Sequence, residues 1–237
     1  MRNRTSALVA VLLLLLVGAT ACSKGKPSAE TGSPSPASPG AEKAGFKVVA
    51  VQAVDAGDRP QAKDKANQVA AQVADLFNTY YTVAFLDPSK WANGQHSGLS
   101  DLFTNDVKGQ VGSQIQGLAL GDLAPKIDSV KPTREEVHVK VFVDDGDMSA
   151  PVVAVNAFFE ASAQAKSKAD GTVKISHTMK TLLAPDGGGY KIAGGTADLA
   201  ADTSAGAMGP AGHRTASLGA SAMTAMASMP VQGVAGR

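Results

Sequence analysis

The spacing of apolar residues changes once along the chain, from a helical period to an alternating one. Between residues 58 and 87, apolar positions recur every three or four residues, as they do on one face of an amphipathic helix. The positions that form this stripe are Ala66, Val69, Ala70, Val73, Leu76, Phe77, Tyr80 and Ala84. The spacing predicts one long helix, and the pair Asp87-Pro88 predicts the start of a short second helix.

A third helical stripe covers residues 99–115, where Gly109 and Gly112 weaken it. After Pro125 the period falls to two, which indicates strands with one buried face. The segments expected as strands are 137–143, 152–166, 173–179 and 190–193, while 46–51 is either a first short strand or a packed entry segment. Helices followed by an antiparallel meander predict an α+β fold, with N-terminal helices packed on a curved antiparallel sheet.

The N-terminus has the order of a bacterial signal peptide. Arg2 and Arg4 precede an apolar run, residues 7–17, that is shorter than the roughly 20 residues of a membrane span. Residues 19–21 (Ala-Thr-Ala) fit ordinary signal peptidase, and with Cys22 they resemble a lipobox that has Ala19 where leucine is preferred. We expect residues 1–21 to be a lipoprotein signal peptide.

The presence of a single cysteine, Cys22, favours lipidation over plain secretion. A lipid thioether at this residue would remove the liability of an unpaired extracellular thiol. Lipidation at Cys22 would hold the mature protein by palmitate-type chains on the extracytoplasmic face of the cell membrane. A secreted protein with a free thiol is the alternative.

Composition divides the mature chain into three zones. Residues 22–45 are rich in Pro, Ser and Gly and predict a flexible, lipid-anchored tether. Residues 46–199 hold nearly all aromatic and branched aliphatic residues and predict the folded domain. Residues 200–237 predict a disordered, low-complexity tail. A Cu(I) site in this tail is conceivable from the thioethers of Met208, Met223, Met226 and Met229 near His213, but incidental methionines are the simpler interpretation.

Charge and motifs exclude several classes of protein. The formal net charge is +1, so the chain has no electrostatic footprint for nucleic acid. It contains no nucleophile elbow, no HExxH pair and no phosphate-binding glycine loop. The cluster at 144–147 (Asp-Asp-Gly-Asp) lacks the later carboxylates of a calcium loop and predicts a turn. We therefore expect no cofactor, no metal and no catalytic residues.

Two features of the element order resemble the NTF2-like (SnoaL-like, cystatin-like) family. The first is the long helix that ends in FNTYYTVAFLDPSKW, followed by the GLSDLFTNDVKGQV helix. The second is the pair of late strands, APVVAVNAFFEASAQ and TVKISHTMKTLLAP. This resemblance covers about residues 58–198 and implies a cone between helices and sheet. The anchor, linker and single domain are also similar to actinobacterial lipoproteins and Mce-associated proteins, and the Ala-, Gly- and Val-rich composition fits such a genome.

The resemblance implies a pocket in the cone, where related enzymes use an Asp or His base with tyrosine partners. The residues expected to line a ligand cavity are Tyr80, Tyr81, Trp91, Phe103, Phe158, Glu160 and His177, with His96, Asp101 and His138 as further candidates. His177 alternates with the same face as Val173, Ile175 and Met179, which predicts that it points inward. Each candidate also has a structural explanation, as a core residue with satisfied hydrogen bonds or as a solvated one.

Two functions follow from these observations. Because no base is paired with a nucleophile, the sequence favours a non-enzymatic interaction or accessory module of an envelope complex, with unidentified envelope proteins as partners. The alternative is a carrier or weak enzyme for a small apolar ligand, which requires Tyr80, Glu160 and His177 to surround an open cone. If phenylalanine or methionine fills the cone, this alternative fails. A homodimer through the sheet face would suit Phe142 and Phe158 if both point outward.

Overall fold

The computed structural model describes residues 42–54, 59–91, 94–143, 151–169, 171–203 and 212–219. The chain divides into residues 1–38 and 39–237, and the described residues all belong to the second unit. The predicted signal peptide, Cys22, most of the tether, the acidic turn at 144–147 and the tail methionines lie outside the described residues. Of the described helices, none combines the length and hydrophobicity that crossing a membrane requires.

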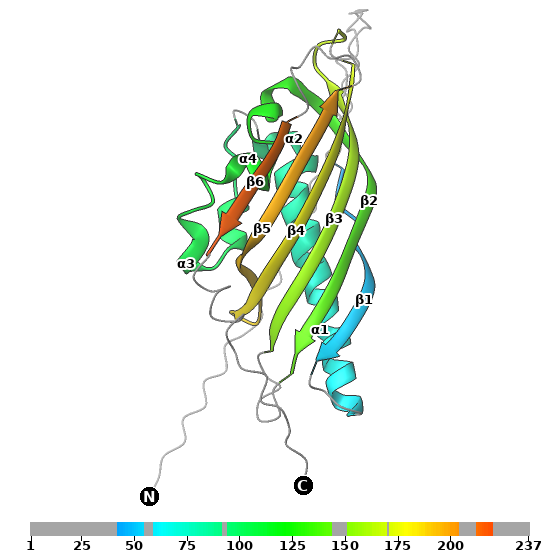
Figure 1. Ribbon diagram of the computed structural model, residues 1–237, viewed down its shortest axis with the longest axis vertical. Helices are drawn as coiled ribbons and strands as arrows, with labels where there is room; N and C mark the ends of the chain where they lie inside the picture. Colours follow the sequence, from blue (N-terminus) through cyan, green and yellow to red (C-terminus); the bar gives the residue numbers. More distant parts are fainter. Residues whose placement is uncertain are drawn as a thin grey trace, which may run out of the picture. The chain divides into compact units, whose positions relative to one another are not determined.

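The described strands form one mixed sheet in the order β1-β2-β3-β4-β5-β6 (Figure 1). The strands are β1 (Lys47–Val54), β2 (Ile127–Phe142), β3 (Val152–Ala165), β4 (Thr172–Asp186), β5 (Gly189–Thr203) and β6 (Gly212–Leu218). Helices pack against this sheet, so the α+β class is confirmed. The expectation of a purely antiparallel sheet is wrong, because β1 pairs with β2 in parallel.

The helices do not come first in the chain, which corrects the predicted order of elements. β1 precedes α1 (Pro60–Tyr81), and the chain passes through the helical segments that the structure describes before it returns to the sheet as β2. A parallel neighbour requires a crossover of this kind, because a short hairpin can join only antiparallel strands. The segment at 46–51 is therefore a true strand, whose partner lies about 90 residues further along the chain.

The long helix predicted from the apolar stripe is confirmed. α1 runs over Pro60–Tyr81 with Pro60 in its first turn, and its stripe is buried except at Leu76, which is half-buried. It continues as a π-helical turn, η1 (Thr82–Leu86), before α2 (Pro88–Trp91) begins. The carboxylate of Asp87 accepts a hydrogen bond from the backbone N–H of Ser89 at 2.9 Å, as expected of a residue that starts a helix.

The single helix predicted over 99–115 is replaced by short turns. They are η3 (Leu99–Leu102), α3 (Asn105–Lys108) and α4 (Ile115–Leu118), and η4 (Gly121–Lys126) follows them. The apolar stripe is still buried at Leu99, Phe103, Val107 and Val111, but Gly109 and Gly112 fall in the non-helical stretch between α3 and α4. Glycine weakens helices enough for packing against the sheet to decide the path of the backbone here.

The domain extends beyond residue 199, so the boundary of the disordered tail needs correction. β5 continues to Thr203, and β6 lies within the segment expected to be unstructured. Tertiary contacts hold this short strand: Arg214 forms an ion pair with Asp122 at 2.9 Å, and the side chains of Ala216 and Leu218 are buried. Small residues give no hydrophobic signal in the sequence, yet they allow the helical turns to approach the strand closely.

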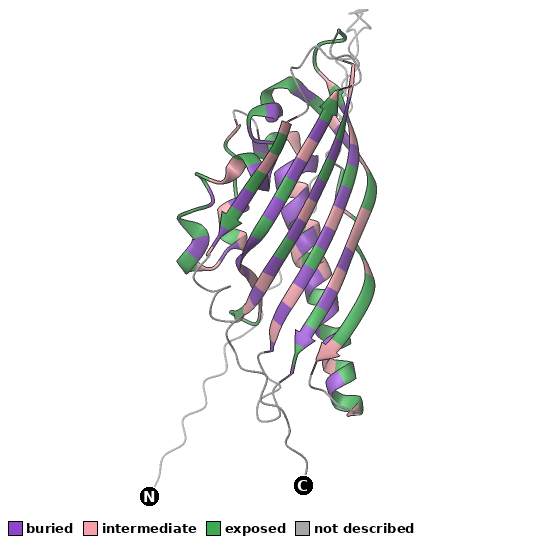
Figure 2. Ribbon diagram, in the orientation of Figure 1, coloured by how far each residue is buried: buried purple, intermediate pink, exposed green. Residues whose placement is uncertain are grey.

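Burial alternates along β3, β4 and the second half of β2, as Figure 2 shows by the bands of colour. One buried row crosses five strands through Val137, Ala157, Met179, Ala197 and Ala216. We call the face that carries this row the inner face, and α1 and the helical turns cover it. The opposite, outer face carries the alternate side chains, among them His138, Phe158, Glu160, Lys174 and Thr196.

Two glycines close the turn between β4 and β5. Gly187 and Gly188 have φ angles of 60° and 90°, which is the left-handed conformation that a tight two-residue hairpin requires. The predicted hairpin at 186–189 is therefore confirmed.

Candidate functional site

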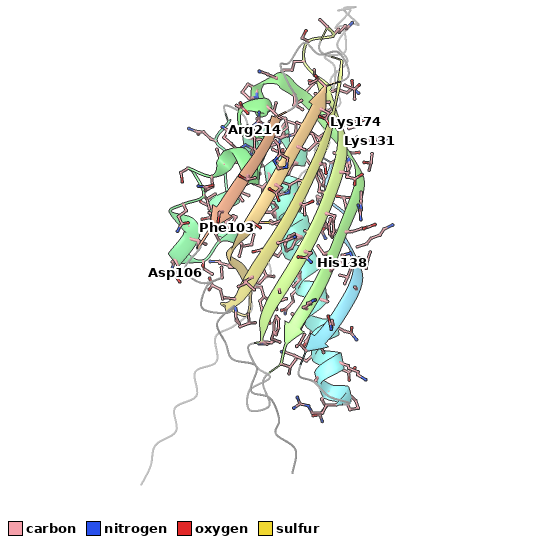
Figure 3. The ribbon with its side chains drawn as sticks, in the orientation of Figure 1. Phe103, Asp106, Lys131, His138, Lys174 and Arg214 are labelled. Atoms are coloured by element: carbon pink, nitrogen blue, oxygen red, sulfur yellow. The ribbon has the colours of Figure 1, made fainter. Side chains whose placement is uncertain are left out.

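Five of the seven predicted cavity residues are buried in the hydrophobic core. Tyr80 and Tyr81 come from the last turn of α1, Trp91 from α2, and His177 from the middle of β4. Phe103, labelled in Figure 3, follows η3 and pairs with Ile192 of β5 through an isolated bridge. All five are 3% exposed or less and lie in the interior, while their role in lining a ligand cavity stays a prediction.

Hydrogen bonds inside this core join Tyr81, His177 and α4. The Nε2 atom of His177 lies 3.0 Å from the backbone carbonyl of Gly117, and its Nδ1 lies 2.8 Å from the hydroxyl of Tyr81. Because a carbonyl oxygen only accepts, Nε2 carries the proton and Nδ1 accepts from Tyr81. The hydroxyl of Tyr80 donates to the carbonyl of Leu118. Every polar group of the three side chains therefore has a partner within the protein.

Aromatic rings fill the space around this network. Tyr81 stacks on Phe46 and Phe159, with ring centroids 4.4 and 4.8 Å apart. Phe85 lies 5.1 Å from both Phe159 and His177. These separations are those of rings in direct contact. Phenylalanine rings therefore fill the space around Tyr81 and His177, where the family resemblance implies an open cone.

Burial keeps the network electrically neutral. It lowers the pKa of His177 to about 4, although the hydrogen bond to the Gly117 carbonyl works in the opposite direction. Burial raises the pKa of Tyr80 well above 10, and it raises the pKa of Tyr81, with the neighbouring Tyr80 as a further cause. At neutral pH His177 is an uncharged imidazole with both nitrogens occupied, which leaves it no free position for proton transfer to a substrate.

Two predicted cavity residues, Phe158 and Glu160, lie on the outer face instead. Glu160 is exposed and forms an ion pair with Arg134 of β2, with 3.2 Å between the charged atoms. Phe158 is half-buried, with the Arg134 guanidinium 5.1 Å from its ring centroid and His138 edge-on at 5.5 Å. The expectation that they face the cone is wrong, because β3 alternates in the opposite phase and turns Phe159 inward.

The remaining titratable candidates are dispersed. Asp101 is exposed in η3, where Lys108 lies 2.6 Å away and lowers the pKa of its carboxyl through a hydrogen bond and its charge. His138 lies on the outer face of β2 (Figure 3). His96 is buried in the loop before η3. The three groups contribute to no common site.

His96 borders a pocket at the end of the helical layer. The pocket has a volume of about 450 Å³ and is lined by residues 94–100, Val111, Gly112 and Ile115. His96 is 2% exposed and has a left-handed backbone with φ of 39°, which is unusual for a residue other than glycine. Its Nε2 accepts from the backbone N–H of Gly121 at 3.3 Å, and burial lowers its pKa to about 4, opposed by the nearby Val83 carbonyl.

Sequence reasoning missed residues that complete the interior. Phe159 and Phe85 both stack on Tyr81, and the carbonyl of Gly117 supplies the acceptor for His177. A Cβ atom at Gly117 would lie 2.6 Å from the backbone nitrogen of Ala216, so only glycine fits between α4 and β6. The alternation of β3 identifies Phe159 only once the phase of that strand is fixed, whereas the contact at Gly117 leaves no signal in the sequence.

Among the described residues, no group of three or more His, Cys, Asp or Glu side chains is arranged to hold a metal ion. The comparisons with known proteins found no matching family model, no matching curated protein and no matching solved structure. The function of this chain therefore has to be inferred from its own residues.

Proposed function

We propose that this protein is a lipid-anchored extracytoplasmic lipoprotein whose domain acts as a non-enzymatic interaction or accessory module of an envelope complex. Cys22 would carry the lipid, and residues 23–45 would act as the tether between the membrane and the domain. The observation that supports a non-enzymatic role most strongly is the closed Tyr81–His177–Gly117 network, because it occupies the place where a cone enzyme needs its base.

A ligand in the cone would have to displace well-packed groups. Tyr81 and Phe159 are both fully buried and stacked on each other, and His177 has no unsatisfied nitrogen. Removing a buried aromatic side chain from a core typically costs about 3–5 kcal/mol. This cost supports a structural role for the interior and moves the search for function to the surface.

The outer face offers a surface that a partner could contact. No helix of the described residues covers this face (Figure 1), and on it the ring of Phe158 lies beside the guanidinium of Arg134 and the imidazole of His138. An aromatic ring beside an arginine is a frequent combination at protein interfaces. We propose this group of three side chains as the contact for an envelope protein.

We also propose that the domain is an NTF2-like variant. The long helix ending at Tyr80 and Tyr81, the short helices after it and the antiparallel pairing of β2 to β6 support this assignment. The parallel strand β1 ahead of α1 and the closed interior are the differences from the pattern on which the resemblance is based.

Metabolic labelling tests the anchor. The full chain is expressed in an actinobacterial host with an alkyne analogue of palmitate, beside Cys22→Ser as the control. We expect label and membrane association in the wild-type chain and neither in the variant. Equal labelling of the two chains, or membrane association that is independent of Cys22, would show that the anchor is wrong.

Photocrosslinking tests the interaction module in the same host. A photoreactive amino acid replaces Thr178, which pairs with Phe158 on the outer face, or Gln68, which is exposed on α1, as the matched control. We expect a discrete covalent adduct with an envelope protein from Thr178 and none from Gln68. Adducts of equal yield from both positions, or from neither, would argue against a partner at the outer face.

A second candidate, small-ligand binding, is favoured by one observation, the pocket beside His96. Its volume of about 450 Å³ lies in the range of small-molecule sites, which is about 300–1,000 Å³. Native mass spectrometry of the protein recovered from its own host tests this function. A retained small molecule that is lost in Gly112→Trp would favour a carrier, and a bare protein would leave the interaction module as the better proposal.

A further inference from the structure

The two edge strands of the sheet, β1 and β6, differ in whether other residues cover their outward backbone groups. At β6, the backbone N–H of Ser217 donates to the side-chain oxygen of Gln114, and the N–H of Gly219 donates to that of Gln110, both at 3.3 Å. These glutamines belong to the turns around α4, which pack against β6. Side chains therefore occupy the outward N–H of Ser217 and that of Gly219 just beyond the strand, which hinders the addition of another strand at this end of β6.

The β1 edge has no such cover among the described residues. Val49 and Val51 are 47% and 38% exposed, which is high for valines in a sheet. Figure 1 shows β1 as the outermost strand on the side opposite β6. No charged residue and no proline occurs from Val48 to Val54. Natural edge strands usually carry such residues to prevent pairing with another chain.

The backbone direction along β1 shows which groups are free to pair. The carbonyl of Val54 accepts from the N–H of Val143, so Val54 faces the β2 side. Since alternate residues of a strand direct their backbone groups to opposite sides, those of Val51 and Ala53 face away from the sheet. The register with β2 is regular from Ala50 to Val54, beyond the bulge at Val49. This segment can accept a strand without rearrangement.

We propose that the β1 edge pairs with β1 of a second copy of this chain, antiparallel about a two-fold axis at Gln52. In this register Val51 lies opposite Ala53 of the second copy, and the two residues exchange both backbone hydrogen bonds. Gln52 lies opposite its own symmetry mate. The result is one sheet that runs continuously through both copies.

The side chains favour a second copy over another partner. A glutamine amide both donates and accepts, so two Gln52 side chains on a two-fold axis can bond to each other. The strand from Val48 to Val54 has no charge that could repel its mate, and Lys47 lies at the far end of each strand. Pairing would also cover the exposed side chain of Val51. An isologous interface requires this kind of self-complementarity.

A dimer through the β1 edge differs from a dimer through the outer face, and it does not depend on the lipid anchor. If the anchor is present, confinement of both copies to one membrane raises their effective concentration, and a weak interface suffices. The two arrangements are separable because Gln52 lies at the edge, whereas Phe158 lies on β3, two strands away.

Cysteine crosslinking tests the register directly. The full chain with Cys22→Ser has no native thiol, and it receives either Gln52→Cys or Ala50→Cys, which are both exposed positions. Non-hydrogen-bonded antiparallel pairs have Cα atoms about 4.5 Å apart, within the range of a disulfide. Two Ala50 residues would be about 13 Å apart along the strands. We expect a covalent dimer from Gln52→Cys and none from Ala50→Cys.

Charge swaps provide a second measurement that needs no disulfide. Gln52→Lys and Gln52→Glu, followed by sedimentation velocity, should each weaken association by up to about fivefold, because like charges then face each other. An equimolar mixture of the two variants should associate again. A chain that stays monomeric at high concentration, an equal yield of disulfide from both cysteines, or a dimer that Phe158→Lys disrupts and Gln52→Lys does not, would overturn the proposal.

Discussion

Acidification should weaken the fold through the buried imidazole of His177. This side chain is fully buried, its Nε2 donates to the Gly117 carbonyl, and its Nδ1 accepts from Tyr81. The folded protein therefore holds it neutral, with a pKa of about 4, against an ordinary value of 6.5. Between these values the unfolded chain binds the proton more readily than the folded one. The stabilising contribution is present above pH 6.5 and is lost as the pH falls toward 4.

The two pKa values give the size of the effect. For a group that titrates at 6.5 when unfolded and near 4 when folded, the free energy of unfolding falls by about 2.5 kcal/mol between pH 7.5 and pH 4.5. His96 is also buried, with its pKa lowered to about 4, and it adds a loss of the same order. A loss of this total size is a large part of the stability of an ordinary domain.

Urea denaturation from pH 4.5 to 7.5 measures the contribution of His177. The comparison uses the wild-type chain, His177→Gln, and His213→Gln as a control at an exposed position of β6. His177→Gln should lower stability at pH 7.5, but its further loss on acidification should be about 2.5 kcal/mol smaller than in wild type. The control should follow the wild-type curve. An unchanged pH dependence in His177→Gln would refute the assignment of a neutral, protected imidazole.

Three further substitutions test the packing. Tyr81→Phe should lower the free energy of unfolding by about 1–3 kcal/mol, because it leaves Nδ1 of His177 buried without a donor; thermal and urea melts measure this. Gly117→Ala should cost more than about 2 kcal/mol and speed amide exchange in β6, because its Cβ would meet the Ala216 nitrogen. Phe158→Ala should cost less than about 1.5 kcal/mol in the same melts, because this ring lies half-exposed on the outer face, and a larger loss would contradict that position.

The sequence is informative where one periodicity is long and continuous. The stripe of α1 runs for more than five turns, so its inward face, including Tyr80, is predictable. The same holds for β4, where alternation with Ile175 and Met179 correctly predicts that His177 points inward. In both cases the burial of apolar side chains on one face determines the pattern.

Prediction from the sequence fails where the pattern does not determine which residues of a strand face inward. In β3 the pair Phe158-Phe159 fits either face, and only the pairing with β2 and β4 decides that Phe159 is buried. A shift by one residue exchanges every side chain between the faces, and this explains the wrong placement of Glu160. β6 was not predicted because its small and polar residues, GHRTASL, resemble a linker in composition, whereas long-range contacts order it.

Competing functions can be weighed by what each would require of the interior. A ligand that binds in the micromolar range contributes about 8 kcal/mol in total. To enter the layer under α1 it would have to separate Tyr81 from Phe159 and break the bond between Tyr81 and His177, which together take up most of that amount. The pocket beside His96 requires no such separation, since it already exists in the folded chain. Any small molecule found with this protein is therefore expected there, and an interaction role depends on the outer face and the β1 edge, where binding displaces only water.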